Sequence, residues 1–300
     1  LLYDPKSAES LIAKAFYYMQ VGEYRLAVPH LEKALEYNPN SSAVIQTLAD
    51  LYARYIPNTE KYLEYALKGN QLEIAANDSI QQSYLYLHLS NAFIQNGFVD
   101  EAQKYINLSL DYNPNNEFRY LKPFVTYAKD HDMKKMIRQL VQEFERDTTR
   151  LDIMQEIGKA YFFEHQFDSS YIYYSKFVRD RERFGLQIFP NENAKISYVF
   201  GKVGETDKAA ELFADYEAFC KEDESIYQSI NRALLFAHKG EIEQGMEQLK
   251  EFAAQNNYQY WVVLFLEDDP LIDPLKSHPD FENTIQRIKD RFRENKATLE

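Results

Sequence analysis

The sequence predicts an all-α protein, a solenoid of about seven helical hairpins with a capping helix at its C-terminal end. Three observations indicate this class. An aromatic residue recurs at intervals of 34 to 41 residues. A small residue usually stands three positions before it, and a glycine or histidine usually stands four positions after it. The fold class therefore rests on a repeated packing unit, because three different residue types keep one phase.

Each repeated position has a physical reason. Small residues let two helices approach closely, and Gly or His tolerates the positive φ of a tight corner. We expect the aromatic ring to fill the gap between one hairpin and the next. The aromatic positions are Tyr18, Tyr52, Phe93, Tyr127, Tyr161, Phe200 and Phe236. The small positions are Ala15, Ala49, Ser90, Phe124, Gly158, Ser197 and Ala233, with Phe124 the exception. The corner positions are Gly22, Ile56, Gly97, His131, His165, Gly204 and Gly240.

Seven hairpins follow from this phase. The second has a longer corner and a stretched second helix, expected over 61–77, and in the fourth Pro123 falls in a first helical turn or kinks it. We expect residues 1–7 to be the tail of a truncated preceding repeat and residues 8–257 to hold the seven repeats. The expected hairpins are 8–40, 42–78, 83–115, 117–148, 151–181, 191–221 and 224–256.

Residues 258–300 are expected to close the stack. A short apolar helix over 258–266 precedes a passage in which Pro270, Pro274 and Pro279 should prevent a helix. A final amphipathic helix follows, with Phe281 and Phe292 on its apolar face and charges on the other. A capping helix needs one face that packs on the last repeat and one face that is exposed to water.

These features resemble the tetratricopeptide repeat family, whose unit has about 34 residues and two antiparallel helices. The closing prolines Pro39 and Pro114 add to the likeness. Two residues depart from it: Phe124 at a small position, and Met136 nine residues after an aromatic, where most of the other hairpins have a small residue such as Ala27. The resemblance implies a right-handed solenoid, with residues 1–300 as a single domain. The Asp-Pro-Leu passages near Pro270 and Pro274 resemble the closing segment of such regions in bacterial signalling proteins. There, an effector domain such as a nucleotide cyclase or a transcriptional regulator usually precedes the repeats, so we expect one before Leu1.

Composition excludes several classes of function. The net charge of −13 makes direct nucleic-acid binding unfavourable, because such binding depends on neutralising phosphates with Lys and Arg. Cys220 is the single cysteine, so no internal disulfide can form and a reducing compartment is favoured. No apolar run reaches the roughly 18 residues of a membrane span. We expect a cytoplasmic module without membrane insertion.

No motif indicates catalysis, a metal or a cofactor. Cys220 has no histidine near it in sequence, and the six histidines form no ligand pair one helical turn apart. His131 and His165 stand at equivalent corners and could share a metal, although turn residues in solvent are the preferred interpretation. Gly201 to Gly204 is a repeat corner and no phosphate-binding loop. We therefore predict a protein that is not an enzyme.

The resemblance implies a concave groove lined by the first helices of the hairpins, suited to a protein or peptide segment. Such a module would dock a partner or regulate a larger signalling protein. The alternative is a small-ligand sensor region of a transcriptional regulator or nucleotide cyclase. The Lys, Arg and Asn clamp of chaperone-binding members is incomplete here. The expected groove residues are Gln46, Asp50, Arg54, Tyr84, Asn91, Gln95, Lys129, Gln155, Lys159, Tyr198, Lys202 and His238.

Overall fold

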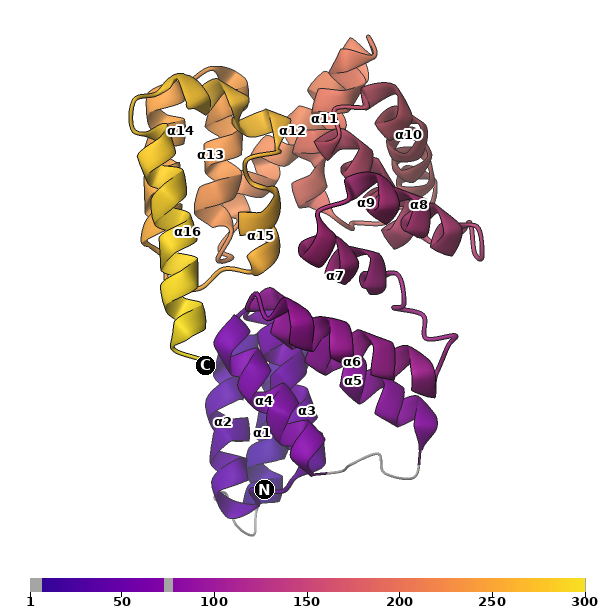
Figure 1. Cartoon of the computed structure of the whole chain (residues 1–300). Helices are drawn as coiled ribbons and strands as arrows, with labels where there is room; N and C mark the ends of the chain where they lie inside the picture. The colour runs from indigo at the N-terminus through magenta and orange to yellow at the C-terminus, as the bar shows by residue number, and fades with distance from the viewer. Residues whose placement is uncertain (1–6, 73–77, 300) are drawn as a thin grey trace. The chain divides into compact units, whose positions relative to one another are not determined.

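A computed structural model describes residues 7–72 and 78–299, and these residues form two compact units (Figure 1). Unit 1 is Leu1–Arg119 and unit 2 is Tyr120–Glu300. Within the described residues the regular structure is entirely helical, so the predicted all-α class is confirmed. We describe each unit by itself, and the single solenoid expected over residues 1–300 stays a prediction.

The described residues of unit 1 form three helical hairpins. In the second of them, the first helix continues as a π-helical segment, η1 (Leu51–Tyr55), before the corner. The longer corner that the sequence predicts follows it, between Tyr55 and the start of α4 at Thr59. The helix pairs are α1 (Ala8–Gln20) with α2 (Tyr24–Tyr37), α3 (Ser42–Asp50) with α4 (Thr59–Gln71), and α5 (Ser79–Gln95) with α6 (Val99–Tyr112).

Unit 2 holds four hairpins and a C-terminal segment. Its pairs are α7 (Leu121–Asp130) with α8 (Met133–Phe144), α9 (Leu151–Phe163) with α10 (Phe167–Arg183), α11 (Asn193–Lys202) with α12 (Thr206–Glu222), and α13 (Gln228–Lys239) with α14 (Ile242–Ala254). The 3-10 segment η2 (Pro190–Glu192) leads into α11. After the last hairpin come α15 (Tyr260–Phe265), the 3-10 helix η3 (Pro270–Ser277) and α16 (Phe281–Ala297).

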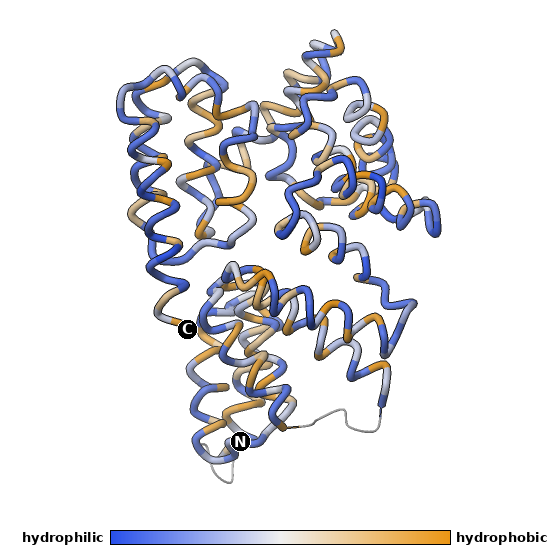
Figure 2. Tube along the Cα trace, in the orientation of Figure 1, coloured by the Kyte–Doolittle hydropathy of each residue, from blue (hydrophilic) through white to orange (hydrophobic). Residues whose placement is uncertain are grey.

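The described helices thus match the seven hairpins predicted from the sequence. Some expected boundaries shift by a few residues, since α4 begins at Thr59 and α10 continues to Arg183. Residues 73–77 of the predicted stretched helix lie outside the described residues, as do residues 1–6 of the predicted tail. Figure 2 shows apolar and polar residues alternating along the helices, as packing on one face requires.

Six of the seven predicted corners have the expected backbone. His131 and His165 both have φ 55°, which is the left-handed region that few L-residues occupy without strain. The four corner glycines also have positive φ, between 74° and 92° at Gly240 and Gly204. Ile56 does not, because η1 carries its chain into the corner with φ −131°. The phase of the repeat therefore located six corners, and the residues at them tolerate positive φ.

The aromatic position packs differently from the expectation. In four hairpins its ring stacks on the second helix of its own hairpin, as Phe93 does on Tyr105 at 5.5 Å, and not primarily on the next hairpin. Phe200 does contact Tyr171 of the preceding hairpin. A ring near the corner meets the returning helix first, because that helix starts only a few residues later. The other three stacks are Tyr18 on His30, Tyr52 on Tyr65, and Tyr161 on Tyr173.

Small residues bring the paired helices together through a recurring hydrogen bond. The Ser90 hydroxyl donates to the Ala102 carbonyl at 2.8 Å, and Ser197 donates to the Ala209 carbonyl at 2.7 Å. In α9 and α10 the direction is reversed, with Ser170 donating to the Gly158 carbonyl at 2.7 Å. A buried hydroxyl is thereby satisfied only where the helices approach closely, so these bonds fix the register of each hairpin.

The C-terminal segment does more than close the stack. Helix α16 packs on α14, as expected of the capping helix, with Phe281 and Phe292 buried. Helix α15 instead reaches α7 and α9, where the Phe265 ring stacks on Tyr127 at 5.2 Å and on Phe163 at 4.8 Å. It therefore packs on two of the first helices that were expected to line the groove.

The proline-rich passage also corrects an expectation. We predicted no helix there, but η3 is a 3-10 helix with Pro270 at its start. Proline is tolerated at a first helical position, because that N–H has no intrahelical partner. The Asp269 carboxylate accepts from the Leu271 N–H at 2.9 Å and caps the segment.

Candidate functional site

Unit 1 carries a cleft of about 400 Å³ between α3, α4 and α5, here called the unit-1 cleft. Three predicted groove residues line it: Gln46 and Asp50 from α3 and Tyr84 from α5. The structure therefore brings together side chains that the sequence placed on the same face of successive first helices. The other lining residues are Ile45, Ala49, Tyr65, Ala66, Gly69, Gln81, Leu85 and His88.

Polar contacts hold the walls of the unit-1 cleft. The Tyr62 hydroxyl lies 3.0 Å from His88 Nδ1, and the predicted groove residue Asn91 donates its Nδ2 to that hydroxyl at 3.4 Å. Burial lowers the pKa of His88, which favours the neutral ring, and Asp50 only partly opposes this. Tyr84 donates to Glu117 at 3.2 Å. The cleft thus offers amide, phenol and neutral imidazole groups.

The remaining predicted groove residues of unit 1 lie elsewhere. Arg54 forms a long ion pair with Asp50 at 3.9 Å, on the exposed side of η1. Gln95 is buried, with 5% of its surface exposed, near the end of α5. Neither residue lines the unit-1 cleft.

Unit 2 carries a larger cavity of about 580 Å³, here called the unit-2 cavity. Its lining includes residues of α7, α9, α11 and α13, the first helices of the four hairpins, and further residues of η2, α12, the α12–α13 connection and α15. Seven aromatic residues line it: Tyr120, Phe124, Phe163, Phe219, Tyr227, Trp261 and Phe265. Six charged residues line it: Glu156, Lys159, Glu192, Lys195, Asp223 and Asp269. Apolar walls with a few charges are typical of small-molecule sites of this size.

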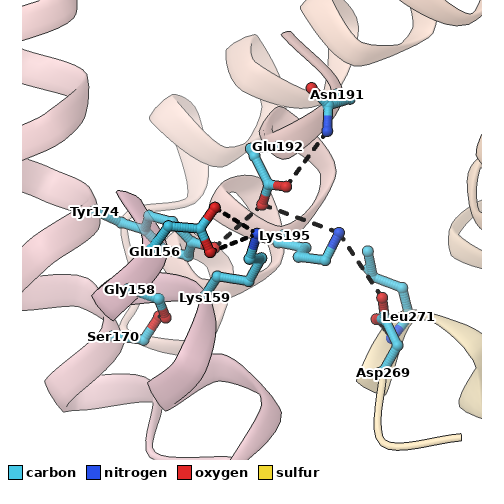
Figure 3. A network of polar contacts seen from close by, with 10 residues as sticks. All are labelled: Glu156, Gly158, Lys159, Ser170, Tyr174, Asn191, Glu192, Lys195, Asp269 and Leu271. Carbon is cyan, nitrogen blue, oxygen red and sulfur yellow. Dashed lines mark hydrogen bonds and ion pairs between the residues drawn. The ribbon is translucent and has the colours of Figure 1, made fainter. Parts of the chain in front are cut away.

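Five of these charged groups form a network (Figure 3). Lys159 Nζ lies 2.7 Å from Glu156 Oε2, one turn away on α9. Lys195 Nζ lies between two carboxylates, 4.0 Å from Glu192 Oε2 and 3.8 Å from Asp269 Oδ2. Three carboxylates therefore share two ammonium groups in a largely buried space.

Packing of α9 on α10 positions this network. A Cβ atom at Gly158 would come within 2.7 Å of the Tyr174 ring, so glycine is what allows the ring to lie against α9. The fully buried Tyr174 then points its hydroxyl at Glu192, 3.4 Å away. Asn191 adds a second hydrogen bond to Glu192 at 3.3 Å. Gly158 thus lets the Tyr174 ring lie where its hydroxyl reaches Glu192.

Burial and charge set the protonation of the network. Burial raises the pKa of Asp269, with Lys195 opposing in part, and burial likewise raises the pKa of Glu156 against Lys159. Burial would also raise the pKa of Glu192, but Lys195 and Lys159 outweigh it and the pKa is lowered. Burial acts to lower the pKa of Lys159, but Glu156 and Glu192 raise it overall. The network therefore has more buried negative charge than its lysines neutralise.

Two predicted groove residues belong to this region. Lys159 lines the unit-2 cavity, and Gln155 is buried on the same helix next to Glu192. The others do not line it. Tyr198 packs on Phe162 and Phe167, and Lys202 lies over the Tyr198 ring at 4.9 Å. His238 stacks on Phe213 of α12 at 3.9 Å, and Lys129 is exposed at the end of α7.

Sequence reasoning missed most of the network, although one signal was present. The position five residues before each aromatic is polar in all hairpins but the first, where it is Ala13. Those polar residues are Thr47, His88, Lys122, Glu156, Lys195 and Asn231. Four of them line the unit-1 cleft or the unit-2 cavity. Glu192 and Asp269 carry no such signal, because they lie in segments outside the repeat.

Three further features of the described residues bear on chemistry: possible metal ligands, the single cysteine and the helix lengths. Across residues 7–72 and 78–299, no group of three or more His, Cys, Asp or Glu side chains is placed to hold a metal ion. Cys220 is buried, and burial raises the pKa of its thiol to about 11. None of the described helices has the length and apolar character to cross a membrane.

Comparison with known proteins supports the repeat assignment in unit 1. The family described as tetratricopeptide repeat matches residues 8–41 and 83–116. Both segments resemble the tetratricopeptide repeat. They contain the first and third hairpins, α1 with α2 and α5 with α6, as the phase of the sequence predicts. A search of curated proteins found no match to the chain.

Solved structures extend the likeness to the fold of both units. A Rap protein complexed with competence and sporulation factor has a TM-score of 0.64 at 12% identity, over 94% of this chain and 88% of that one. The apo form of RapI has a TM-score of 0.56 at 11% identity, over 86% and 98%. A tetratricopeptide repeat protein from Parabacteroides merdae has a TM-score of 0.53 at 13% identity, over 94% and 98%. At such identities the likeness shows the fold alone.

Proposed function

We propose that this chain is a non-catalytic binding module that holds a protein or peptide segment against the first helices of its hairpins. The observation that carries the proposal is the unit-1 cleft, where Gln46, Asp50 and Tyr84 from successive hairpins line one space. An aromatic ring beside amide and carboxylate groups suits an extended or helical segment. The Rap structure, solved with a bound factor, has a similar fold and is consistent with this role.

Selection of binders from a random peptide library on the immobilised full chain tests the proposal. Tyr84→Ala should weaken a selected peptide about tenfold or more, since a half-buried aromatic is a common anchor of binding energy. Tyr112→Ala is the matched control, because Tyr112 is an exposed tyrosine on a second helix of the same unit. Equal loss in both variants, or no peptide enriched at all, would contradict the proposal.

A second candidate function is a small-ligand sensor. It is favoured by the unit-2 cavity, whose volume of about 580 Å³ lies in the usual range for small-molecule sites. A thermal-shift screen of metabolites on the full chain distinguishes the two, because a specific ligand stabilises the folded state by mass action. The sensor function predicts a ligand that raises the melting temperature, and the rise should be the same in Tyr84→Ala, because Tyr84 does not line the unit-2 cavity.

We further propose that the module is the docking or regulatory region of a larger cytoplasmic signalling protein of bacteria. The support is the Asp-Pro-Leu passage around η3, which resembles the closing segment of such regions. The coding sequence upstream of Leu1 tests this directly. An open reading frame with no nucleotide cyclase or transcriptional regulator domain would count against it.

A further inference from the structure

The charged lining of the unit-2 cavity is not balanced. Four carboxylates line it, from Glu156, Glu192, Asp223 and Asp269, but only two ammonium groups, from Lys159 and Lys195. Glu156 and Lys159 form one close pair and neutralise each other. The imbalance therefore lies with the other three carboxylates and Lys195.

Lys195 is shared between two carboxylates. Its ammonium lies 4.0 Å from Glu192 and 3.8 Å from Asp269, which is within ion-pair range but beyond hydrogen-bond distance. Both carboxylates are at most 6% exposed. Glu192 also accepts from Asn191 and Tyr174, and Asp269 accepts from the Leu271 N–H; Lys159 acts on Glu192 from further away, beyond ion-pair distance. Three buried carboxylates, from Glu156, Glu192 and Asp269, thus share the two ammonium groups of Lys159 and Lys195.

Asp223 is a further carboxylate of the cavity, and it has no ion-pair partner among the described residues. It is 6% exposed and accepts from the Ser225 N–H and from Asn231 Nδ2, both at 2.8 Å. Among residues 7–72 and 78–299, no ammonium or guanidinium group lies within ion-pair distance of it. A buried carboxylate is costly unless a positive charge compensates it.

The aromatic wall supplies the complement to these charges. Trp261, Tyr227 and Phe219 line the same cavity as Asp223 and Asp269. An organic cation is attracted both by carboxylates and by the faces of aromatic rings, most strongly by Trp. Apolar rings also remove the body of such a ligand from water.

We propose that the unit-2 cavity binds an organic ammonium ion that carries an apolar or aromatic body. The proposal rests on the chain being a binding module and names the ligand chemistry of its second site. The ammonium could belong to a free amine or to the N-terminus of a peptide, since both present the same group. An anionic ligand is disfavoured, because it would approach Lys195 past the carboxylates of Glu192 and Asp269.

Isothermal titration of the full chain tests this with three probes of similar shape. The probes are 2-phenylethylamine, 2-phenylethanol and 3-phenylpropionate, which are cationic, neutral and anionic at pH 7. We expect 2-phenylethylamine to bind at least about tenfold more tightly than the other two. Equal or tighter binding of 3-phenylpropionate, or no binding of the amine, would overturn the proposal.

Asp269→Asn is the decisive variant. The amide keeps an oxygen that can accept from the Leu271 N–H, so the cap of η3 is retained while the charge is lost. We expect at least tenfold weaker binding of the amine, and Asp223→Asn should act in the same direction. Asp207→Asn is the control, because Asp207 is an exposed carboxylate in the first turn of α12, outside the cavity. Unchanged affinity in a folded Asp269→Asn variant would overturn the proposal.

A peptide arm separates the two sources of the ammonium. Phe-Gly-Gly with a free N-terminus should bind more tightly than its N-acetylated form. If the free peptide binds more tightly than 2-phenylethylamine, the site takes a peptide terminus, and the reverse order assigns a free amine. Loss of peptide selection in the unit-1 experiment would leave this titration unaffected, so the two proposals fail separately.

Discussion

Lys195 shows how a single residue of the repeat pattern acquires a function that the pattern does not specify. Its position, five residues before Phe200, recurs as a polar position in other hairpins. Lys195 itself lies within ion-pair distance of Glu192 and Asp269, which belong to segments between and after the hairpins. The chemistry of the cavity therefore depends on where irregular segments place two carboxylates.

Asp269 makes stability depend on pH in a predictable direction. Burial raises its pKa in the folded state, so the folded protein holds this proton more tightly than the unfolded chain. Its contribution to the free energy of unfolding therefore falls as pH rises from about 4 through the folded pKa, by about 1.4 kcal/mol for each unit of pKa difference.

Asp269→Asn should remove this dependence. We expect the free energy of unfolding of the variant, relative to wild type, to increase between pH 4 and pH 7. Urea unfolding at the two pH values measures it, with Asp207→Asn as control for the loss of one carboxylate. A relative stability that falls with pH would mean that Lys195 compensates Asp269 fully.

Cys220 should be chemically inert in the folded protein. It is 1% exposed, and burial raises the pKa of its thiol to about 11, so very little thiolate forms near pH 8. We expect a disulfide-exchange reagent to label native protein at least about 100-fold more slowly than protein in denaturant. Fast labelling of the native form would show that α12 opens readily around this residue.

At the level of elements, two helical glycines have different roles, and alanine substitution separates them. A Cβ at Gly158 would meet the Tyr174 ring at 2.7 Å, whereas a Cβ at Gly201 would lie 3.9 Å from Ala209. Gly158→Ala should destabilise the protein by about 1–3 kcal/mol, because α9 and α10 must separate. It should also displace Tyr174 from Glu192.

Gly201→Ala is the matched control in another helix. We expect it to be neutral or to stabilise by up to about 1 kcal/mol, because alanine has the higher helix propensity and meets ordinary contact distances. Chemical denaturation of both variants measures the difference. Equal destabilisation would indicate that the close contact at Gly158 relaxes without cost.

The net charge of the whole molecule disfavours non-specific binding to nucleic acids. With a formal charge of −13, the chain repels a phosphate backbone, and the short basic clusters are mixed with acids. Fluorescence anisotropy with single-stranded RNA and duplex DNA should show no binding at about 150 mM salt, and lowering the salt should not create it. Binding that strengthens steeply at low salt would reveal a basic surface that total charge conceals.

The sequence by itself determined the hairpins, because they arise from local rules. Helical periodicity, small residues at contacts, and glycine or histidine at positive φ act over a few residues each. The described residues accordingly show seven hairpins, with six of the seven corners in the left-handed region. The same local rules place Gln46, Asp50 and Tyr84 on one face of successive first helices, and these three residues line the unit-1 cleft.

Only the tertiary structure decided the unit-2 cavity. Glu192 and Asp269 lie outside the repeat, and no periodic rule places them beside Lys195. Likewise, α15 packs on α7 and α9 through Phe265, a contact between residues far apart in the chain. Such contacts depend on the path of the chain after the last hairpin, which local preferences do not specify. That is why the paired helices were predictable and the buried charges they enclose were not.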